Sequence, residues 1–145
     1  AKPGSPNLYG LVGGEANAIQ PQKRMLSSMT PTIIEKDDEL FMVVGTPGGS
    51  TIITGVFQTI VNVIEFGLSM QQAVAEGRFH HQWLPDHIKI EKDRFNKENM
   101  ESLIKIGHQF KEVNSMNRID AILVLPDGKY EGGADPRGDD KAIGF

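Results

Sequence analysis

The chain has 145 residues, the length of one domain, and with 39% hydrophobic and 23% charged residues its composition is that of a globular protein. The formal net charge of −4 argues against nucleic acid or an anionic membrane as a partner, because an acidic surface holds neither. No apolar run approaches the roughly 20 residues that a membrane-spanning helix needs. The absence of cysteine excludes disulfides, thiolate zinc sites and cysteine nucleophiles.

Residues 1–30 are predicted to form a loop-rich arm. Turn-forming pairs such as Gly13-Gly14 interrupt the segment, and no helical or strand period survives between them. The arm nevertheless carries apolar side chains at Leu8, Tyr9 and Ile19, so we expect it to pack on polypeptide outside these 145 residues. The first residues show no initiator methionine and no signal-peptide pattern, which predicts a chain cut from a longer protein.

Residues 31–145 are predicted to form an αβ core. Its expected elements are, in chain order, a hairpin over 32–44, helices over 50–66 and 69–77, a strand over 87–91, a helix over 96–106 and a hairpin over 119–134. The strand at 40–44 is apolar on both faces, so we expect both faces to be covered. This order of elements indicates an α+β fold with helices layered on antiparallel strands.

The segment 45–50 (GTPGGS) lies between the predicted buried strand and the predicted long helix. Its consecutive glycines, Gly48 and Gly49, leave two backbone N–H groups without side chains where the helix dipole is positive. Such groups can hold an anion, or the oxyanion of an acyl-transfer intermediate. The same residues also suit a tight turn that needs glycine for its backbone angles. A nucleotide-binding loop is not expected, because no lysine follows the glycines.

Adjacent serines, Ser27 and Ser28, lie shortly before the first predicted strand. Two neighbouring hydroxyls can donate a pair of hydrogen bonds to one carboxylate, which makes them candidate binding residues. The alternative is that serine, threonine and proline only form turns in a loop here.

Two further groups of residues invite a metal-binding interpretation. His80 and His81 would point to opposite faces of an extended chain, which makes a shared ion awkward. Asp135, Asp139 and Asp140 lack the spacing of a calcium-binding EF-hand loop and are predicted to form a solvated acidic loop. We therefore predict no metal and no cofactor. The sequence also lacks the G-x-S-x-G nucleophile pattern.

Five segments, taken together, resemble the C-terminal part of the small subunit of γ-glutamyltransferase (glutathione hydrolase). They are 7–14 (NLYGLVGG), 23–32 (KRMLSSMTPT), 45–50, 78–86 (RFHHQWLPD) and 135–137 (DPR). The resemblance implies the αββα sandwich of N-terminal-nucleophile hydrolases, of which residues 1–145 would form an incomplete portion with antiparallel strands and packed helices. It also implies a precursor, or zymogen, that cleaves itself and frees an N-terminal threonine. That threonine attacks a γ-glutamyl amide such as glutathione to form an acyl-enzyme, and water, an amino acid or a peptide then accepts the acyl group.

The resemblance assigns roles to residues that the local chemistry had already singled out. Gly48 and Gly49 would form the oxyanion hole, and Ser27 and Ser28 would bind the α-carboxylate of the γ-glutamyl group. Met25 departs from the proline usual at its position. The nucleophile is expected outside this chain, together with the large subunit and the N-terminal part of the small subunit as partners.

The resemblance also leads to expectations for the isolated chain. We expect it to be inactive alone, to expose an unpaired sheet edge and apolar surface, and to self-associate. Bacterial relatives are usually periplasmic or secreted. Two alternatives stay open. One is a related amidase, of the poly-γ-glutamate depolymerase or cephalosporin acylase type, and the other is a non-catalytic binding module of the same fold.

Overall fold

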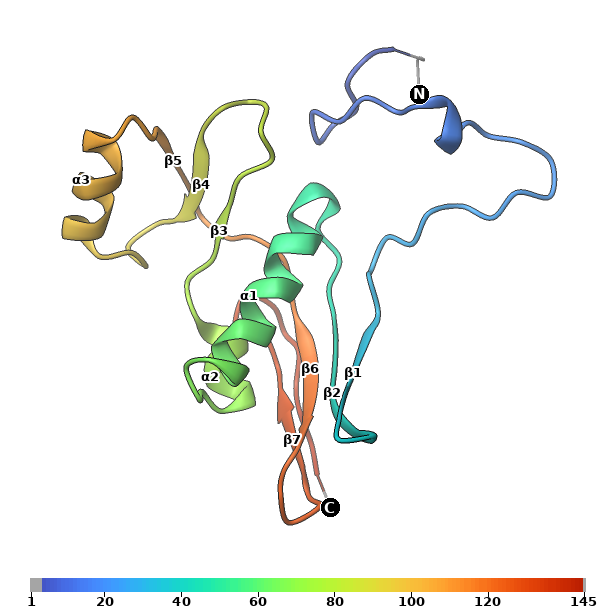
Figure 1. The fold of residues 1–145 in the computed structure, drawn as a ribbon, viewed down its shortest axis with the longest axis vertical. Helices are drawn as coiled ribbons and strands as arrows, with labels where there is room; N and C mark the ends of the chain where they lie inside the picture. The colour runs from blue at the N-terminus through green and yellow to red at the C-terminus, as the bar shows by residue number, and fades with distance from the viewer. Residues whose placement is uncertain (1–3, 145) are drawn as a thin grey trace.

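The computed structural model describes residues 4–144, whose elements are labelled in Figure 1. In chain order these are η1 (Glu15–Asn17), β1 (Thr32–Lys36), β2 (Glu39–Gly45), η2 (Gly49–Thr51), α1 (Ile52–Ile64), α2 (Met70–Ala75), β3 (Phe79–His80), β4 (Ile88–Glu91), α3 (Lys97–Lys105), β5 (Phe110–Val113), β6 (Asp120–Val124) and β7 (Tyr130–Gly133). Both predicted hairpins and all three predicted helices are present, with ends within a few residues of the expected ones.

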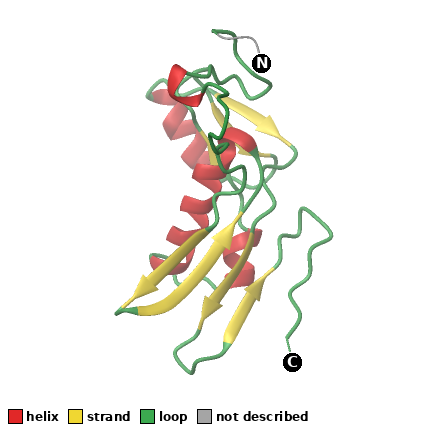
Figure 2. Cartoon of the chain, turned by 90° about the vertical axis from the view of Figure 1, so that its right-hand side faces the viewer, coloured by secondary structure: helices red, strands yellow, loops and turns green. Residues whose placement is uncertain are grey.

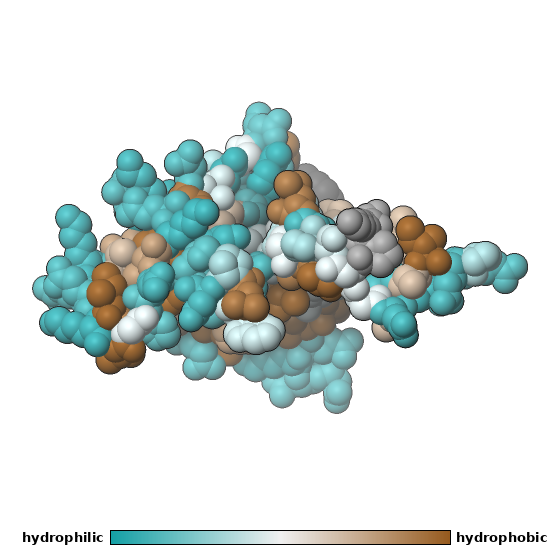
Figure 3. Space-filling view, turned by 90° about the horizontal axis from the view of Figure 1, so that it is seen from above, coloured by the Kyte–Doolittle hydropathy of each residue, from teal (hydrophilic) through white to brown (hydrophobic). Residues whose placement is uncertain are grey.

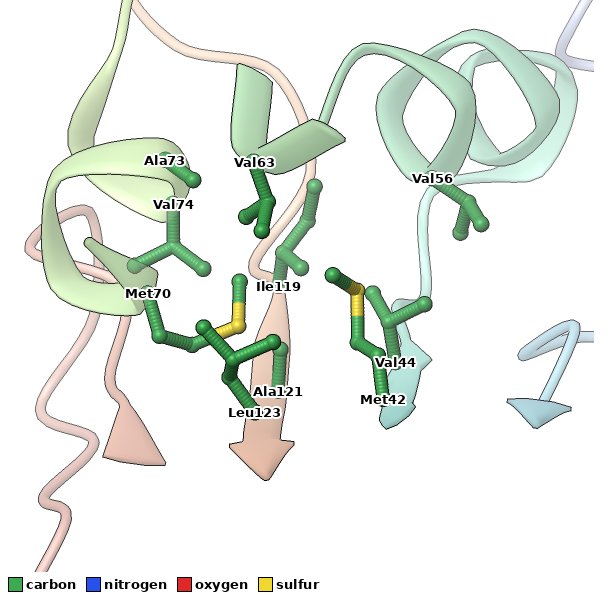
Figure 4. Close-up of a cluster of buried hydrophobic side chains, with 10 residues drawn as sticks. All are labelled: Met42, Val44, Val56, Val63, Met70, Ala73, Val74, Ile119, Ala121 and Leu123. Atoms are coloured by element: carbon green, nitrogen blue, oxygen red, sulfur yellow. The ribbon is translucent and has the colours of Figure 1, made fainter. Parts of the chain in front are cut away.

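A four-stranded antiparallel sheet with the order β1-β2-β6-β7 forms the centre of the molecule (Figure 2). Side chains from β2 and β6 meet those of α1 and α2 on one face of this sheet (Figure 4). The buried cluster comprises Met42, Val44, Val56, Val63, Met70, Ala73, Val74, Ile119, Ala121 and Leu123. Burial of each large aliphatic side chain contributes about 1.5–3 kcal/mol, so this cluster is the main source of stability.

The other face of the sheet is open, which corrects the expectation that β2 is covered on both sides. The strand register places Ile33, Val43 and Ile122 side by side across β1, β2 and β6. Their side chains are 68%, 36% and 48% exposed. An apolar row of this kind is typical of a sheet face that a further layer covers.

A smaller sheet with the order β3-β4-β5 lies beyond the helices. β4 and β5 pair in parallel, with α3 in the connection between them, which adds one parallel pair to the predicted antiparallel strands. Asn96 caps α3, since its Oδ1 accepts hydrogen bonds from the N–H groups of Glu98 (2.8 Å) and Asn99 (3.3 Å).

Two structural features bear on the predicted surface properties. Residues 4–30 of the arm loop out beyond the sheets and then return toward the start of α1 (Figure 1). The regular structure among these residues is η1 and one isolated bridge, between Pro6 and Val12. On α1, Ile53 and Phe57 are 74% and 62% exposed. Seen from above, apolar patches alternate with polar ones (Figure 3).

Every helix within residues 4–144 is too short or too polar to cross a bilayer.

Candidate active site

The glycine loop joins the end of β2 to the start of α1, as the sequence predicts. Gly48 has φ 146° and Gly49 has φ 61°, backbone conformations that side-chain-bearing residues rarely adopt. A Cβ atom on Gly48 would collide with the side chain of Asn117, and one on Gly49 with the ring of Tyr9. The turn therefore requires glycine on conformational and on steric grounds.

The N–H groups of Gly48 and Gly49 have no acceptor among residues 4–144. Gly48 is the N-cap and Gly49 the first residue of the continuous η2 and α1 helical segment, where the helix dipole leaves a partial positive charge. Two unpaired donors at such a position can bind an anion or stabilise a developing oxyanion. The tight-turn interpretation and the anion-site interpretation are thus both compatible with this loop.

Thr46 anchors the base of the loop. Its side chain is fully buried, and its Oγ1 lies 2.7 Å from the Pro47 carbonyl oxygen and 2.8 Å from the Arg118 carbonyl oxygen. The N–H of Arg118 donates back to the same hydroxyl over 3.2 Å. The N–H of Thr46 donates to the carbonyl of Met29 over 3.0 Å, which ties the glycine loop to the segment that carries the two serines.

Both serines are exposed. Ser27 Oγ accepts hydrogen bonds from the N–H groups of Met29 (3.3 Å) and Thr30 (3.2 Å). Those bonds occupy the oxygen lone pairs and leave the hydroxyl hydrogen free to donate. Ser28 Oγ makes no hydrogen bond within the described part of the chain. Two hydroxyl donors are thus available for a carboxylate.

Tyr9 brings the N-terminal arm onto the glycine loop, a contact that the sequence did not indicate. Its ring packs against Gly49. The Gln82 side chain holds the Tyr9 backbone, because its Nε2 donates to the Tyr9 carbonyl (3.1 Å) and to the Leu84 carbonyl (3.0 Å). The arm is therefore fixed to the segment 78–86 beside the candidate site.

His80 continues this hydrogen-bond chain toward α1. Both amide hydrogens of Gln82 are used by carbonyls, so its Oε1 accepts from His80 Nε2 (3.0 Å). His80 Nδ1 then accepts from the hydroxyl of Thr54 on α1 (2.8 Å). The acceptor at Gln82 places a proton on Nε2. Burial lowers the pKa of His80. His81 is exposed, and this arrangement agrees with packing rather than metal binding for the histidine pair.

A buried ion cluster unites the two remaining motifs of the sequence. Arg78 Nη2 lies 2.6 Å from Asp135 Oδ2, and Arg137 pairs with both Glu91 and Asp135. Burial alone would raise the pKa of the Asp135 and Glu91 carboxyls, but hydrogen bonds from N–H groups and from the two guanidinium groups outweigh it and hold both pKa values below their usual range.

The prediction that residues 135–140 form a solvated acidic loop is correct only in part. Asp135 is buried because it belongs to the ion cluster, whereas Asp139 and Asp140 pair with Arg118 over 2.7 and 2.8 Å at the surface. Within residues 4–144 no group of three or more His, Cys, Asp or Glu side chains is arranged to hold a metal ion. Each of these aspartates pairs with an arginine.

Comparison with known proteins identifies the fold and the family. The solved structures that resemble the chain have the fold of N-terminal-nucleophile hydrolases, which confirms the predicted α+β class. The whole chain, residues 1–145, matches the family model of gamma-glutamyltranspeptidase. The chain belongs to the γ-glutamyltranspeptidase family.

The relatives agree with this assignment. The chain is 49% identical over 146 residues to the glutathione hydrolase proenzyme of Escherichia coli, covering 100% of this chain and 25% of that protein. A mutant Helicobacter pylori gamma-glutamyltranspeptidase superposes with a TM-score of 0.88 at 50% identity, over 95% of this chain and 76% of the other. The Pseudomonas nitroreducens enzyme complexed with L-DON gives a TM-score of 0.84 at 41% identity, over 100% of this chain and 75% of the other. The chain spans about a quarter of the length of the curated relatives it matches.

Proposed function

We propose that the complete protein transfers or hydrolyses γ-glutamyl groups of glutathione-like amides through a threonine acyl-enzyme. Family membership supports the reaction class. The observation that carries the assignment within this chain is the pair of unpaired N–H groups on Gly48 and Gly49. We further propose that residues 1–30 act as a loop-rich arm on the core of 31–145, and that the large subunit and the rest of the small subunit complete the site.

In the proposed mechanism the threonine hydroxyl attacks the γ-glutamyl carbonyl carbon, and its proton passes to the α-amino group of the same threonine. Negative charge then develops on the carbonyl oxygen, and the N–H groups of Gly48 and Gly49 donate to it. One such preorganised donor accelerates acyl transfer by about 10²–10³-fold. When the intermediate collapses, the C–N bond breaks and the α-ammonium group returns its proton to the departing amine. Water or the amine of an amino acid or peptide then attacks the acyl-enzyme, and its proton passes through the α-amino group to the threonine oxygen as the ester bond breaks.

Ser27 and Ser28 are proposed to hold the α-carboxylate of the γ-glutamyl group. Two hydrogen bonds to a charged group would orient the substrate and select γ-glutamyl amides over amides without that carboxylate. No residue of 1–145 is proposed as the nucleophile. From the family resemblance we also propose a periplasmic or secreted location for the complete protein.

The test is a kinetic comparison on the complete protein with two anilide substrates. For a γ-glutamyl anilide, the double variant Ser27→Ala with Ser28→Ala should raise KM about 100-fold or more, because each of the two lost donors removes about 1.5 kcal/mol of carboxylate binding and every 1.4 kcal/mol is about a factor of ten. For a 4-aminobutyryl anilide, which lacks the α-carboxylate, the same variant should behave as the wild type does.

Ser102→Ala is a matched control for this test, since Ser102 is an exposed serine on α3 whose hydroxyl binds only the Glu98 carbonyl (2.9 Å). It should change neither substrate's kinetics. An unchanged KM for the γ-glutamyl anilide in the double serine variant would discard the carboxylate assignment. Absence of γ-glutamyl turnover in the wild-type complete protein would discard the proposed function itself.

A further inference from the structure

We propose that Thr51 and Asn117 are positioning residues that orient the two N–H donors of the glycine loop by holding the carbonyl group of the same peptide unit. This inference rests on the proposed function. In a planar trans peptide the N–H of one residue and the C=O of the preceding residue point in opposite directions. A side chain that fixes the carbonyl therefore fixes the direction of the N–H on the other side.

The N–H of Gly49 belongs to the peptide unit whose carbonyl is that of Gly48. Thr51 contacts this carbonyl twice, with its Oγ1 at 2.9 Å and its backbone N–H at 3.3 Å. The Thr51 hydroxyl is therefore committed to the glycine loop. Its hydrogen bond also polarises the peptide and strengthens the opposite N–H as a donor.

The N–H of Gly48 belongs to the peptide unit whose carbonyl is that of Pro47. Asn117 Nδ2 donates to this carbonyl over 3.3 Å, and Thr46 Oγ1 approaches the same oxygen to 2.7 Å. The Asn117 carboxamide also fills the space beside Gly48 and reaches the first turns of α1, where a Cβ on Gly55 would lie 3.0 Å from its Oδ1. Asn117 thus packs between the glycine loop and the helix.

The buried ion cluster explains how Asn117 is held in place. Asn117 has a left-handed backbone, with φ 60°, in a short segment before β6. On one side of it, the N–H of Met116 donates to Glu91 Oε1 over 2.7 Å. On the other side, the N–H of Ile119 donates to Asp135 Oδ2 over 2.8 Å. The ion cluster of Arg78, Glu91, Asp135 and Arg137 therefore clamps the segment that supports the glycine loop.

A threonine series in the complete protein tests the inference. Thr51→Val keeps the shape of the side chain and removes the hydroxyl, so kcat for a γ-glutamyl anilide should fall about five- to tenfold while KM stays within twofold. Thr51→Ser restores the hydroxyl and should recover kcat. Thr59→Val is the matched control, because it removes an equivalent internal bond, from Thr59 Oγ1 to the Gly55 carbonyl (3.0 Å), away from the loop; its kcat should be unchanged.

The variant Asn117→Asp tests the role of Asn117 through the pH dependence of kcat, which a merely structural role would not alter. An ionised carboxylate cannot donate to the Pro47 carbonyl and places negative charge beside Gly48, whereas a protonated carboxyl can donate. The ratio of variant to wild-type kcat should therefore be low, at about one-tenth or less, at neutral pH and should rise as pH falls. Asn99→Asp, on exposed α3, adds the same charge elsewhere and should show a flat ratio.

The outcomes separate this inference from the proposed function. Thr51→Val with kcat within twofold of wild type, or with only KM raised, would overturn the inference. A ratio of Asn117→Asp to wild-type kcat that does not change with pH would overturn the role proposed for Asn117. In either case turnover of the γ-glutamyl anilide by the wild-type complete protein would leave the proposed function standing. If Gly48→Ala also retained full turnover, the oxyanion assignment would fall together with the inference.

Discussion

Replacement of Asp135 by asparagine tests the claim that the ion cluster clamps the segment before β6. The carboxylate accepts four hydrogen bonds: Oδ2 from Arg78 Nη2 (2.6 Å) and the Ile119 N–H (2.8 Å), and Oδ1 from the Arg137 N–H (3.0 Å) and Arg137 Nη1 (3.1 Å). Asp135→Asn keeps the shape. However, the substitution replaces one carboxylate oxygen by an NH₂ group, which must then face two N–H donors. It also leaves the guanidinium groups of Arg78 and Arg137 with Glu91 as the only remaining carboxylate of the cluster.

The expected loss of stability is about 4 kcal/mol. Breaking a buried ion pair by removing one partner costs about 3–5 kcal/mol. Counting instead two lost hydrogen bonds to a charged group, at about 1.5–3 kcal/mol each, gives a similar figure. Because a typical domain has only about 5–15 kcal/mol of stability, the variant should be severely weakened.

Denaturant unfolding of the complete protein, combined with hydrogen exchange of residues 116–124, measures this effect. The Ile119 amide should exchange faster in Asp135→Asn, because it loses its acceptor. Asp139→Asn removes a surface pairing with Arg118 instead and should change little, as exposed ion pairs contribute little. A loss below 1 kcal/mol in Asp135→Asn, with unchanged exchange at Ile119, would refute the reasoning.

The same variant should show a defined pH dependence. The folded-state pKa values of Asp135 and Glu91 lie below their usual range, so the unfolded chain binds more protons than the folded one as pH falls. Their contribution is therefore fully present above the unfolded pKa of about 4 and is lost as pH falls through the lower folded value. The stability gap between wild type and Asp135→Asn should narrow below about pH 4. A gap that stayed constant to low pH would contradict this assignment.

Two further predictions concern His80 and the open sheet face. Because burial lowers the pKa of His80, the unfolded state takes up a proton first as pH falls through about 6.5, so the stability of the folded protein should decline below that pH. The variant His80→Asn lacks this titration and should show a flatter curve of Tm against pH between about pH 5 and 7. An equal slope in variant and wild type would contradict the prediction. The isolated 145-residue chain should self-associate through its exposed apolar sheet face. The double variant Val43→Lys with Ile122→Lys should shift the chain toward monomer in sedimentation velocity runs. A wild-type chain that stays monomeric would contradict the predicted self-association.

The elements that sequence patterns predicted well are those governed by local rules. The hairpin of β1 and β2 follows from two apolar runs around a polar turn. α2 begins at Met70 because Ser69, its N-cap, forms a complete capping box with Gln72. The glycine loop was also found locally, since Gly48 and Gly49 stand between a strand and a helix. Spacing and residue type alone determine each of these features.

Features that depend on distant segments were not predicted. β3 has only two residues, too few for any periodicity, and its pairing with β4 becomes visible only in the folded chain. Asp135 was assigned to a solvated loop because nothing near it in sequence shows that Arg78 lies against it. Likewise Asn117 sits in an unremarkable polar stretch, and its contact with Gly48 depends on anchors far along the chain.

A crystal structure of the complete protein with a γ-glutamyl phosphonate bound to its nucleophile is the most direct test of the central claim. The account predicts that the phosphonyl oxygen that mimics the oxyanion lies about 2.7–3.1 Å from the backbone nitrogens of both Gly48 and Gly49. It also predicts that the Ser27 and Ser28 hydroxyls contact the α-carboxylate. An oxyanion held by other groups, with both glycine N–H groups turned away from it, would contradict the account.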